Sequence, residues 1–226
     1  MDLHFTIRMN PKLFVRDPEQ SELGRNILRF AVRMISDIGF ETFTFKKLAQ
    51  EIGTTEAGIY RYFENKHRLL IYISDWFWTW MEYRVVFHTN NLTDPKKKIL
   101  LIIQLLTFKL DDAIGDPSVD KAKLFRIAIT EASKSYLTSH VSQDNKDQLF
   151  KPYKDLCARV ADIFTEYSPA YPFPRSLAST LIETVHYQFF FWKNLPSLTD
   201  FAGEKSDQAI INFLENLVFT SLDSKI

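Results

Sequence analysis

The segment between residues 44 and 63 constrains the fold most, because it encodes two short amphipathic helices separated by one glycine. Thr44 can cap the first helix, since a threonine hydroxyl accepts hydrogen bonds from the free backbone N–H groups at a helix start. Gly53 suits a left-handed turn after it, and Thr55 can cap the second helix. The inward-facing residues of the first helix, at helical spacing, are Phe45, Leu48, Ala49 and Ile52. The pattern predicts two short helices joined by a tight turn.

The second of these helices has only a narrow apolar side. Ile59 and Phe63 stand four residues apart and are expected to point to the core. The residues expected to lie outward or at the edges are Glu56, Ala57, Gly58, Tyr60, Arg61 and Tyr62. Two short helices with a glycine turn, following a longer helix, are what a helix-turn-helix requires.

The longer helix before them is predicted between Pro18 and Gly39. Asp17 can cap it, Pro18 suits the first helical position and Gln20 stands three residues after the cap. Its apolar stripe consists of Ile27, Phe30, Ala31, Met34, Ile35 and Ile38. Another face carries Arg25, Arg29 and Arg33, which form either a solvated stripe or a set of phosphate contacts.

The whole chain is expected to be all-α, because period 3.6 recurs throughout and no stretch alternates over strand length. A fourth helix is predicted from Asn65 to about His88. Further helices are predicted near 95–113, 118–138, 145–167, 174–193 and 205–222, which gives about nine in total. The expected division is an N-terminal arm (1–17), a three-helix helix-turn-helix DNA-binding domain (18–66) and a larger helical effector-binding and dimerisation domain (67–226).

Charge and cysteine content exclude several classes of protein. The net charge is zero, so the chain does not coat nucleic acid by bulk electrostatics, and any DNA contact is local. Cys157 is the only cysteine, which rules out an intrachain disulfide and favours a reducing cytoplasm. No secretory signal is seen, and the apolar runs fall short of the ~20 residues that cross a bilayer, so we expect a cytoplasmic protein without a membrane partner.

Residues 44–66, which read TFKKLAQEIGTTEAGIYRYFENK, resemble the DNA-binding signature of the TetR (tetracycline repressor) family. The matching features are the cap at Thr44, Leu48-Ala49, Gly53 in the turn, the pairs Ile59-Tyr60 and Tyr62-Phe63, and Lys66 followed by Leu69. The resemblance covers about the first third of the chain. It implies a transcriptional regulator, as a rule a repressor, that binds a palindromic double-stranded DNA operator as a homodimer and responds to a small-molecule effector.

The expected DNA contacts fall into two groups. A recognition helix places its N-terminal residues nearest the base edges, so Thr55, Glu56, Ala57 and Gly58 are predicted to read sequence. Glu56 can only accept hydrogen bonds, so it either meets a cytosine amino group or points to solvent. Lys46 is placed to reach a guanine or a phosphate. The residues predicted to bind the DNA backbone, following the family, are Thr44, Tyr60, Arg61, Tyr62 and Lys66. For the two tyrosines, core packing is the alternative.

Dimerisation is expected through the last two long helices, by resemblance to the family. Two apolar stripes fit this role, and both could instead form an ordinary intramolecular core. The first consists of Leu177, Leu181, Val185 and Phe189, and the second of Ile210, Phe213, Leu214 and Leu217.

The effector is expected to be a small apolar or aromatic molecule bound within the preceding helices. Aromatic residues at helical spacing are more often core than pocket, so each residue is a weak candidate on its own. They are Phe108, Phe125, Tyr136, Tyr153, Phe164, His186 and Tyr187.

Rival interpretations concern enzymes and carriers. Glu64-x-x-His67 and Glu183-x-x-His186 have the spacing of di-iron ligands in helical bundles, but the first lies in the connection after the predicted recognition helix. No nucleophile elbow, phosphate loop or dinucleotide fingerprint is found. We therefore expect no enzyme, catalytic residue, cofactor or metal. A helical carrier of lipids or other small molecules, without operator binding, is the remaining alternative.

Overall fold

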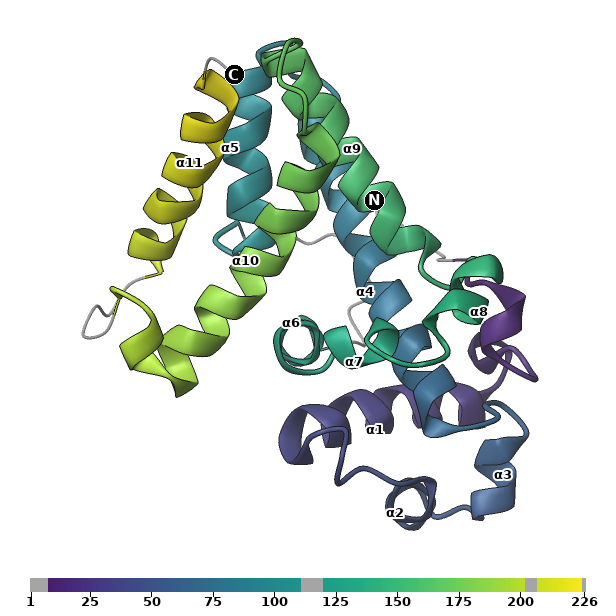
Figure 1. Cartoon of the computed structure of the whole chain (residues 1–226). Coiled ribbons are helices and arrows are strands. Elements are labelled where there is room, and N and C mark those ends of the chain that lie inside the picture. Colours follow the sequence, from purple (N-terminus) through teal and green to yellow (C-terminus); the bar gives the residue numbers. More distant parts are fainter. Residues whose placement is uncertain (1–7, 111–119, 202–206, 225–226) are drawn as a thin grey trace. The chain divides into compact units, whose positions relative to one another are not determined.

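The computed structural model describes residues 8–110, 120–201 and 207–224, and all regular secondary structure in these ranges is helical (Figure 1). This confirms the predicted all-α class. The α-helices are α1 Glu22–Ile38, α2 Phe45–Ile52, α3 Glu56–Tyr60, α4 Lys66–Thr89, α5 Pro95–Leu106, α6 Lys121–Thr130, α7 Ser133–Tyr136, α8 Val141–Lys146, α9 Lys151–Tyr167, α10 Pro174–Asn194 and α11 Gln208–Asp223. Short 3₁₀ helices are η1 Pro11–Leu13, η2 Pro18–Gln20 and η3 Pro196–Leu198.

The chain forms two compact units. Unit 1 comprises Met1–Trp78 and Gly115–Pro152, and unit 2 comprises Thr79–Ile114 and Tyr153–Ile226. In unit 1, α1 packs against η2, α2 and α6, and α2 packs against α3. In unit 2, α11 packs against α5 and α10. Helix α4 belongs to both units, since its residues 66–78 lie in unit 1 and 79–89 in unit 2.

The start of the first helix differs from the prediction. Asp17 accepts a hydrogen bond from the Glu19 N–H at 3.0 Å, but it caps the 3₁₀ turn η2 and not α1. Helix α1 begins at Glu22 with Ser21 as its cap. The predicted helix is interrupted there because η2 folds back onto α1. The contact is close, since a Cβ built at Gly24 lies only 2.2 Å from the Pro18 carbonyl oxygen.

The predicted apolar stripe of α1 also needs correction. Ile27, Ala31 and Ile35 are fully buried, whereas Ile38 is 41% exposed. Val32, outside the stripe, is buried. The buried face is therefore displaced and wider than predicted, because α1 has neighbours on more than one side.

Three predicted helices end early or are divided. The helix expected to reach 113 ends at Leu106, and Phe108 has a φ of 56° in the left-handed region. Gln148, with a φ of 59°, separates α8 from α9 where one helix was expected to begin near 145. The helix predicted over 118–138 is split into α6 and α7 at Glu131. Residues 111–113, 118–119 and 205–206 of the predicted helices lie outside the described ranges.

The contact between Gly24 and Pro18 predicts a stability effect. We expect Gly24→Ala to lower the free energy of unfolding by about 2 kcal/mol, because the methyl group meets rigid backbone. Gly58→Ala is the matched control, since the nearest atom to its Cβ is a rotatable Thr54 hydroxyl at 2.9 Å and helical alanine is favoured by about 1 kcal/mol. Urea unfolding followed by circular dichroism measures both, and equal stabilities of the two variants would contradict this account.

Candidate nucleic-acid interface

Helices α2 and α3 form the predicted helix-turn-helix with the predicted caps. The Thr44 hydroxyl accepts a hydrogen bond from the Lys47 N–H at 3.2 Å. Gly53 has φ 78° and ψ 34°, the left-handed conformation that closes α2. The Thr55 hydroxyl then accepts from the Gly58 N–H at 3.1 Å. The sequence therefore sets both helix starts and the turn by local hydrogen bonds.

Helix α3 presents one face to solvent and the other to the core of unit 1. Ile59 is fully buried, and Gly58 is buried beside Thr54. The residues at the start and on the outer side are exposed, namely Thr55, Glu56, Ala57, Tyr60 and Arg61. Of the four residues expected to read bases, Gly58 thus faces the protein, whereas Thr55, Glu56 and Ala57 are exposed.

Helix α2 adds exposed polar side chains. Thr44 and Lys46 are both exposed. Tyr60 is 48% exposed, and its ring lies edge-on to Phe45 with 5.1 Å between the centroids. The ring contact fixes the phenol, while its exposed part can reach a neighbouring molecule.

The side chain of Tyr62 belongs to the core of unit 1. Its side chain is buried, and its hydroxyl shares a 2.8 Å hydrogen bond with Ser21, the cap of α1. Of the two tyrosines, Tyr62 therefore packs in the core, and Tyr60 is the exposed one.

Lys66 also has partners inside unit 1. Its ammonium donates to the carbonyl oxygens of Phe40, Phe43 and Glu41 at 3.0, 3.2 and 3.3 Å. It lies 4.6 Å from the centroid of the Phe40 ring. Three backbone acceptors satisfy the three donors of an ammonium group, so Lys66 joins the start of α4 to the loop that precedes α2.

A basic residue of the N-terminal arm lies beside the end of α3. The Val15 N–H donates to the Tyr62 carbonyl oxygen at 2.8 Å, and the guanidinium of Arg16 lies 5.6 Å from the centroid of the Tyr62 ring. Arg16 is exposed. Sequence analysis missed this residue, and the only signal was its charge shortly before the first helix.

The arginine stripe of α1 contacts the protein itself. Arg25 donates to the Glu19 carbonyl oxygen at 2.7 Å and Arg29 to the Asn26 side chain at 2.9 Å. Arg33 pairs with Glu51 of α2. These contacts favour the solvated-stripe interpretation of the three arginines.

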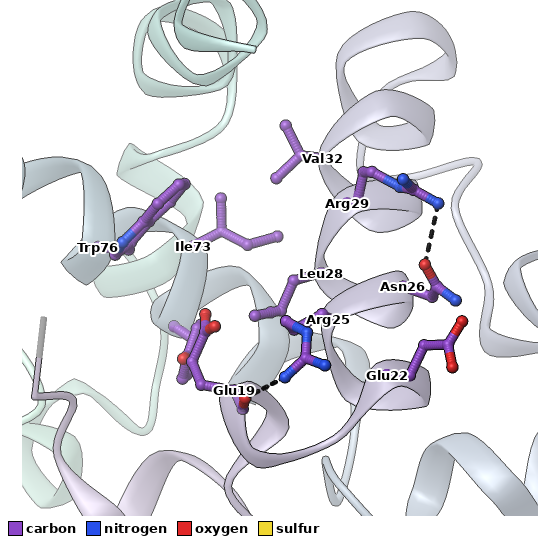
Figure 2. Close-up of a pocket in the computed structure, with 10 residues that line it drawn as sticks. Glu19, Glu22, Arg25, Asn26, Leu28, Arg29, Val32, Ile73 and Trp76 are labelled. Atoms are coloured by element: carbon purple, nitrogen blue, oxygen red, sulfur yellow. Dashed lines mark hydrogen bonds between the residues drawn. The ribbon is translucent and has the colours of Figure 1, made fainter. Parts of the chain in front are cut away.

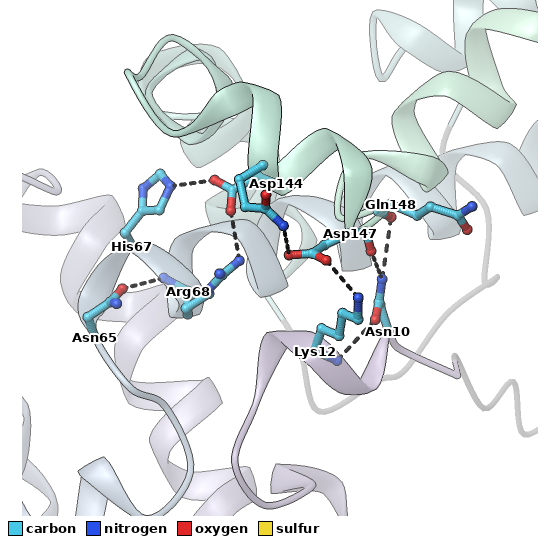
Figure 3. Close-up of polar contacts among 9 residues, drawn as sticks. Asn10, Lys12, Asn65, His67, Arg68, Asp144, Asp147 and Gln148 are labelled. Carbon is cyan, nitrogen blue, oxygen red and sulfur yellow. Dashed lines mark hydrogen bonds and ion pairs between the residues drawn. The ribbon is translucent and has the colours of Figure 1, made fainter.

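A polar network fixes the arm and the start of α4 to α8 (Figure 3). The buried carboxylate of Asp144 pairs with Arg68 at 3.0 Å and lies 3.6 Å from His67. Lys12 pairs with Asp147 at 2.6 Å and its hydrogen bond lowers the pKa of that carboxyl. Burial lowers the pKa of His67, against the opposing effect of Asp144. These polar contacts therefore stabilise the helix-turn-helix region in addition to its apolar core.

The predicted effector residues are divided between the two units. Phe125 and Tyr136 lie in unit 1 and the other five in unit 2. Phe164 is fully buried core, whereas Tyr187 is 48% exposed and stacks on Phe191. Tyr153 donates to the Glu183 carboxylate at 2.7 Å. Phe108 lies with its ring centroid 5.6 Å from that of Trp80.

The two predicted dimer stripes largely pack inside the chain. Five of their residues are buried, namely Leu177, Leu181, Val185, Ile210 and Leu214. Phe189 and Leu217 are half-buried, and Phe213 is 39% exposed. Since α10 and α11 pack against each other, the stripes fit the intramolecular-core alternative.

The described ranges contain few groups suited to catalysis or metal binding. There, no three His, Cys, Asp or Glu side chains are grouped so as to hold a metal ion. Burial raises the pKa of Cys157 to about 11, so its thiol is protonated at neutral pH and is a poor nucleophile. None of the described helices combines the length and the apolar composition that a bilayer-spanning segment needs.

The fold and the exposed helix α3 define an all-α protein with a helix-turn-helix at its N-terminus. Residues 27–73 match the family of bacterial regulatory proteins described as tetR family. This segment includes α2 and α3, so the match confirms the family resemblance predicted from residues 44–66. No curated protein matches the sequence.

Solved structures of regulators share the fold at low sequence identity. AibR in complex with isovaleryl coenzyme A and operator DNA is 18% identical, with a TM-score of 0.61, over 86% of this chain and 97% of AibR. FadR from Bacillus halodurans is 17% identical, with a TM-score of 0.61, over 97% of this chain and all of that one. FadR from Bacillus subtilis in complex with stearoyl-CoA is 18% identical, with a TM-score of 0.60, over 89% and 99%.

His186 predicts a pH dependence of stability. Burial lowers the pKa of His186 to about 4, against the opposing effect of Glu183. As the pH falls below about 6.5 the unfolded chain binds a proton that the folded chain does not bind until about pH 4, so stability is lost across this window. We expect the free energy of unfolding of His186→Gln to fall about 2 kcal/mol less than that of the wild type between pH 7 and pH 5.

Urea unfolding at the two pH values measures this difference. His140→Gln, at an exposed site, is the matched control for replacement of an imidazole. An unchanged dependence in His186→Gln would show that the imidazole does not stay neutral in the folded chain.

Proposed function

We propose that the protein is a transcriptional repressor that binds a palindromic operator as a homodimer. The exposed face of α3 carries this proposal. Glu56 and Ala57 stand at its start, Tyr60 and Arg61 follow on the same exposed side, and Ile59 anchors the helix from behind. A short helix with a free N-terminal face suits the major groove, where base edges are read. A regulator of this kind acts on the chromosome in the cytoplasm.

The contacts divide by chemistry. Thr55, Glu56 and Ala57 would face base edges, whereas Thr44, Lys46, Tyr60 and Arg61 would face phosphates or, for Lys46, a guanine. Arg16 joins the phosphate group because it is exposed beside α3. The side chains of Tyr62 and Lys66 instead stabilise the domain through hydrogen bonds within the protein.

The effector is proposed to be a small molecule with an apolar or aromatic part. Two relatives by fold were solved with acyl-coenzyme A thioesters, isovaleryl coenzyme A in AibR and stearoyl-CoA in FadR. Acyl-CoA thioesters are therefore the first compounds to test for release of the operator complex. To release the operator, the effector must bind more tightly to a conformation of the dimer in which the two helix-turn-helix domains are wrongly spaced for the operator.

Binding of genomic fragments at several salt concentrations tests operator recognition. If a dimer neutralises about 8 phosphates, log affinity falls with log salt at a slope near −7. We expect Arg61→Gln to reduce that slope by about 2 per dimer, and Glu56→Gln to change the ranking of operator variants. Lys66→Gln should keep the slope and lower stability, because its ammonium is bound by carbonyl oxygens.

Lys97→Gln, at an exposed site in α5, is the matched control for loss of one charge. The wild-type slope in Arg61→Gln would remove Arg61 from the interface. Ligand binding without affinity for any duplex would instead support the alternative of a helical carrier.

Dimerisation is proposed to use the exposed aromatic residues of α10 and α11. Tyr187 and Phe213 are 48% and 39% exposed, unlike most of the two predicted stripes. We expect the double variant Tyr187→Glu, Phe213→Glu to sediment as a monomer, since two buried charges at an interface are strongly unfavourable. Leu137→Glu, at a site 72% exposed in unit 1, should remain a dimer. If the double variant sediments with the mass of a dimer and has a native circular dichroism spectrum, this surface is not the dimer interface.

A further inference from the structure

A cavity of about 370 Å³ lies within unit 1, between α1 and the first half of α4 (Figure 2). Its size is at the lower end of the range of small-molecule sites, which is about 300–1,000 Å³. None of the residues predicted to bind the effector lines it. This cavity is therefore distinct from the effector site predicted for the helices that follow the DNA-binding domain.

Four of the residues that line this cavity form an apolar side. Leu28 and Val32 of α1 face Ile73 and Trp76 of α4 across it (Figure 2). Val32 and Ile73 are otherwise buried, and Trp76 is half-buried. Such a wall takes an apolar group, and the indole offers a flat surface for an aromatic ring.

The lip of the cavity carries charges of both signs in equal number. Arg25 and Arg29 stand against Glu19 and Glu22, all within two turns of η2 and α1. Arg25 uses one N–H for the Glu19 carbonyl oxygen and Arg29 one for Asn26, and a guanidinium has five. A carboxylate can therefore bind an arginine fork, while an ammonium group can bind an acidic side chain at the same lip.

We propose that this cavity binds a zwitterionic molecule with an apolar group, of the kind represented by a large apolar or aromatic amino acid. The carboxylate binds at Arg25 and Arg29, the ammonium group at Glu22, and the side chain lies against Leu28, Ile73 and Trp76. A purely anionic ligand can pair only with the arginines, and a purely cationic ligand only with the glutamates, so a zwitterion makes more charge-assisted hydrogen bonds than either.

Occupancy affects the helix that the two units share. The ligand adds contacts between α1 and residues 66–78 of α4, and the same helix continues into unit 2. A ligand that binds only the folded state raises its stability in proportion to the logarithm of ligand concentration. The site thus couples the concentration of a zwitterion to the stability of the α1–α4 packing.

Calorimetric titration of the full-length protein with L-phenylalanine, in the absence of DNA, tests the proposal. We expect saturable binding of one molecule per chain and a higher thermal unfolding midpoint. 3-Phenylpropionate, which lacks the ammonium group, and phenylalaninol, which lacks the carboxylate, should each bind about tenfold more weakly, since one charge-assisted hydrogen bond is lost.

Variants then locate the site. Arg29→Gln and Glu22→Gln should each weaken binding about tenfold. Arg33→Gln and Glu51→Gln, the neighbouring ion pair that does not line the cavity, should bind as the wild type does. Trp76→Phe should abolish any ligand-induced change in tryptophan fluorescence while calorimetric binding persists.

Three results would each overturn the proposal. They are the absence of saturation at the solubility limit of L-phenylalanine, equal affinity for 3-phenylpropionate, and wild-type affinity in both lip variants. Because no DNA is present, these results do not bear on operator binding, and the two proposals can fail independently.

Discussion

The exposed surface of α3 depends on the burial of Ile59. A helix of five residues has no stability of its own in water, so it forms only because it packs against a larger body. Ile59 and Phe63 have no exposed surface, and Leu48 of α2 is equally buried. This apolar packing, with the Thr55 cap, decides which side of α3 faces outward. The residues proposed to face DNA are therefore determined by the apolar packing behind them.

Charged residues around this core are used mainly to hold it. Lys66 binds three carbonyl oxygens, Arg68 pairs with Asp144, and Arg33 pairs with Glu51. Arg16, Lys46 and Arg61 are exposed cations on or beside α2 and α3. A chain with zero net charge can bind a polyanion in this way, because a few cations on one local surface are enough to face it.

The sequence predicted the features that are set locally. Thr44, Gly53 and Thr55 act within three or four residues of themselves, and their roles could be predicted from spacing alone. The partners of Lys66 lie 23 to 26 residues earlier in the chain, which no local pattern reveals. Phe108 and Gln148 interrupt predicted helices at positive φ although neither is glycine. Tertiary packing selects these conformations at a cost that propensity does not predict.

The two predicted dimer stripes show a different limit of sequence analysis. An apolar stripe says that a helix face is buried, but the identity of its partner is not encoded in the period. The family match is confined to residues 27–73, whereas the similarity to solved structures extends over most of the chain and concerns the fold. A difference in what each part must contact can account for this. A duplex presents nearly constant phosphate geometry, which restricts the residues that can face it. Helices around a small-molecule site need only remain apolar and well packed, so many sequences satisfy the same fold.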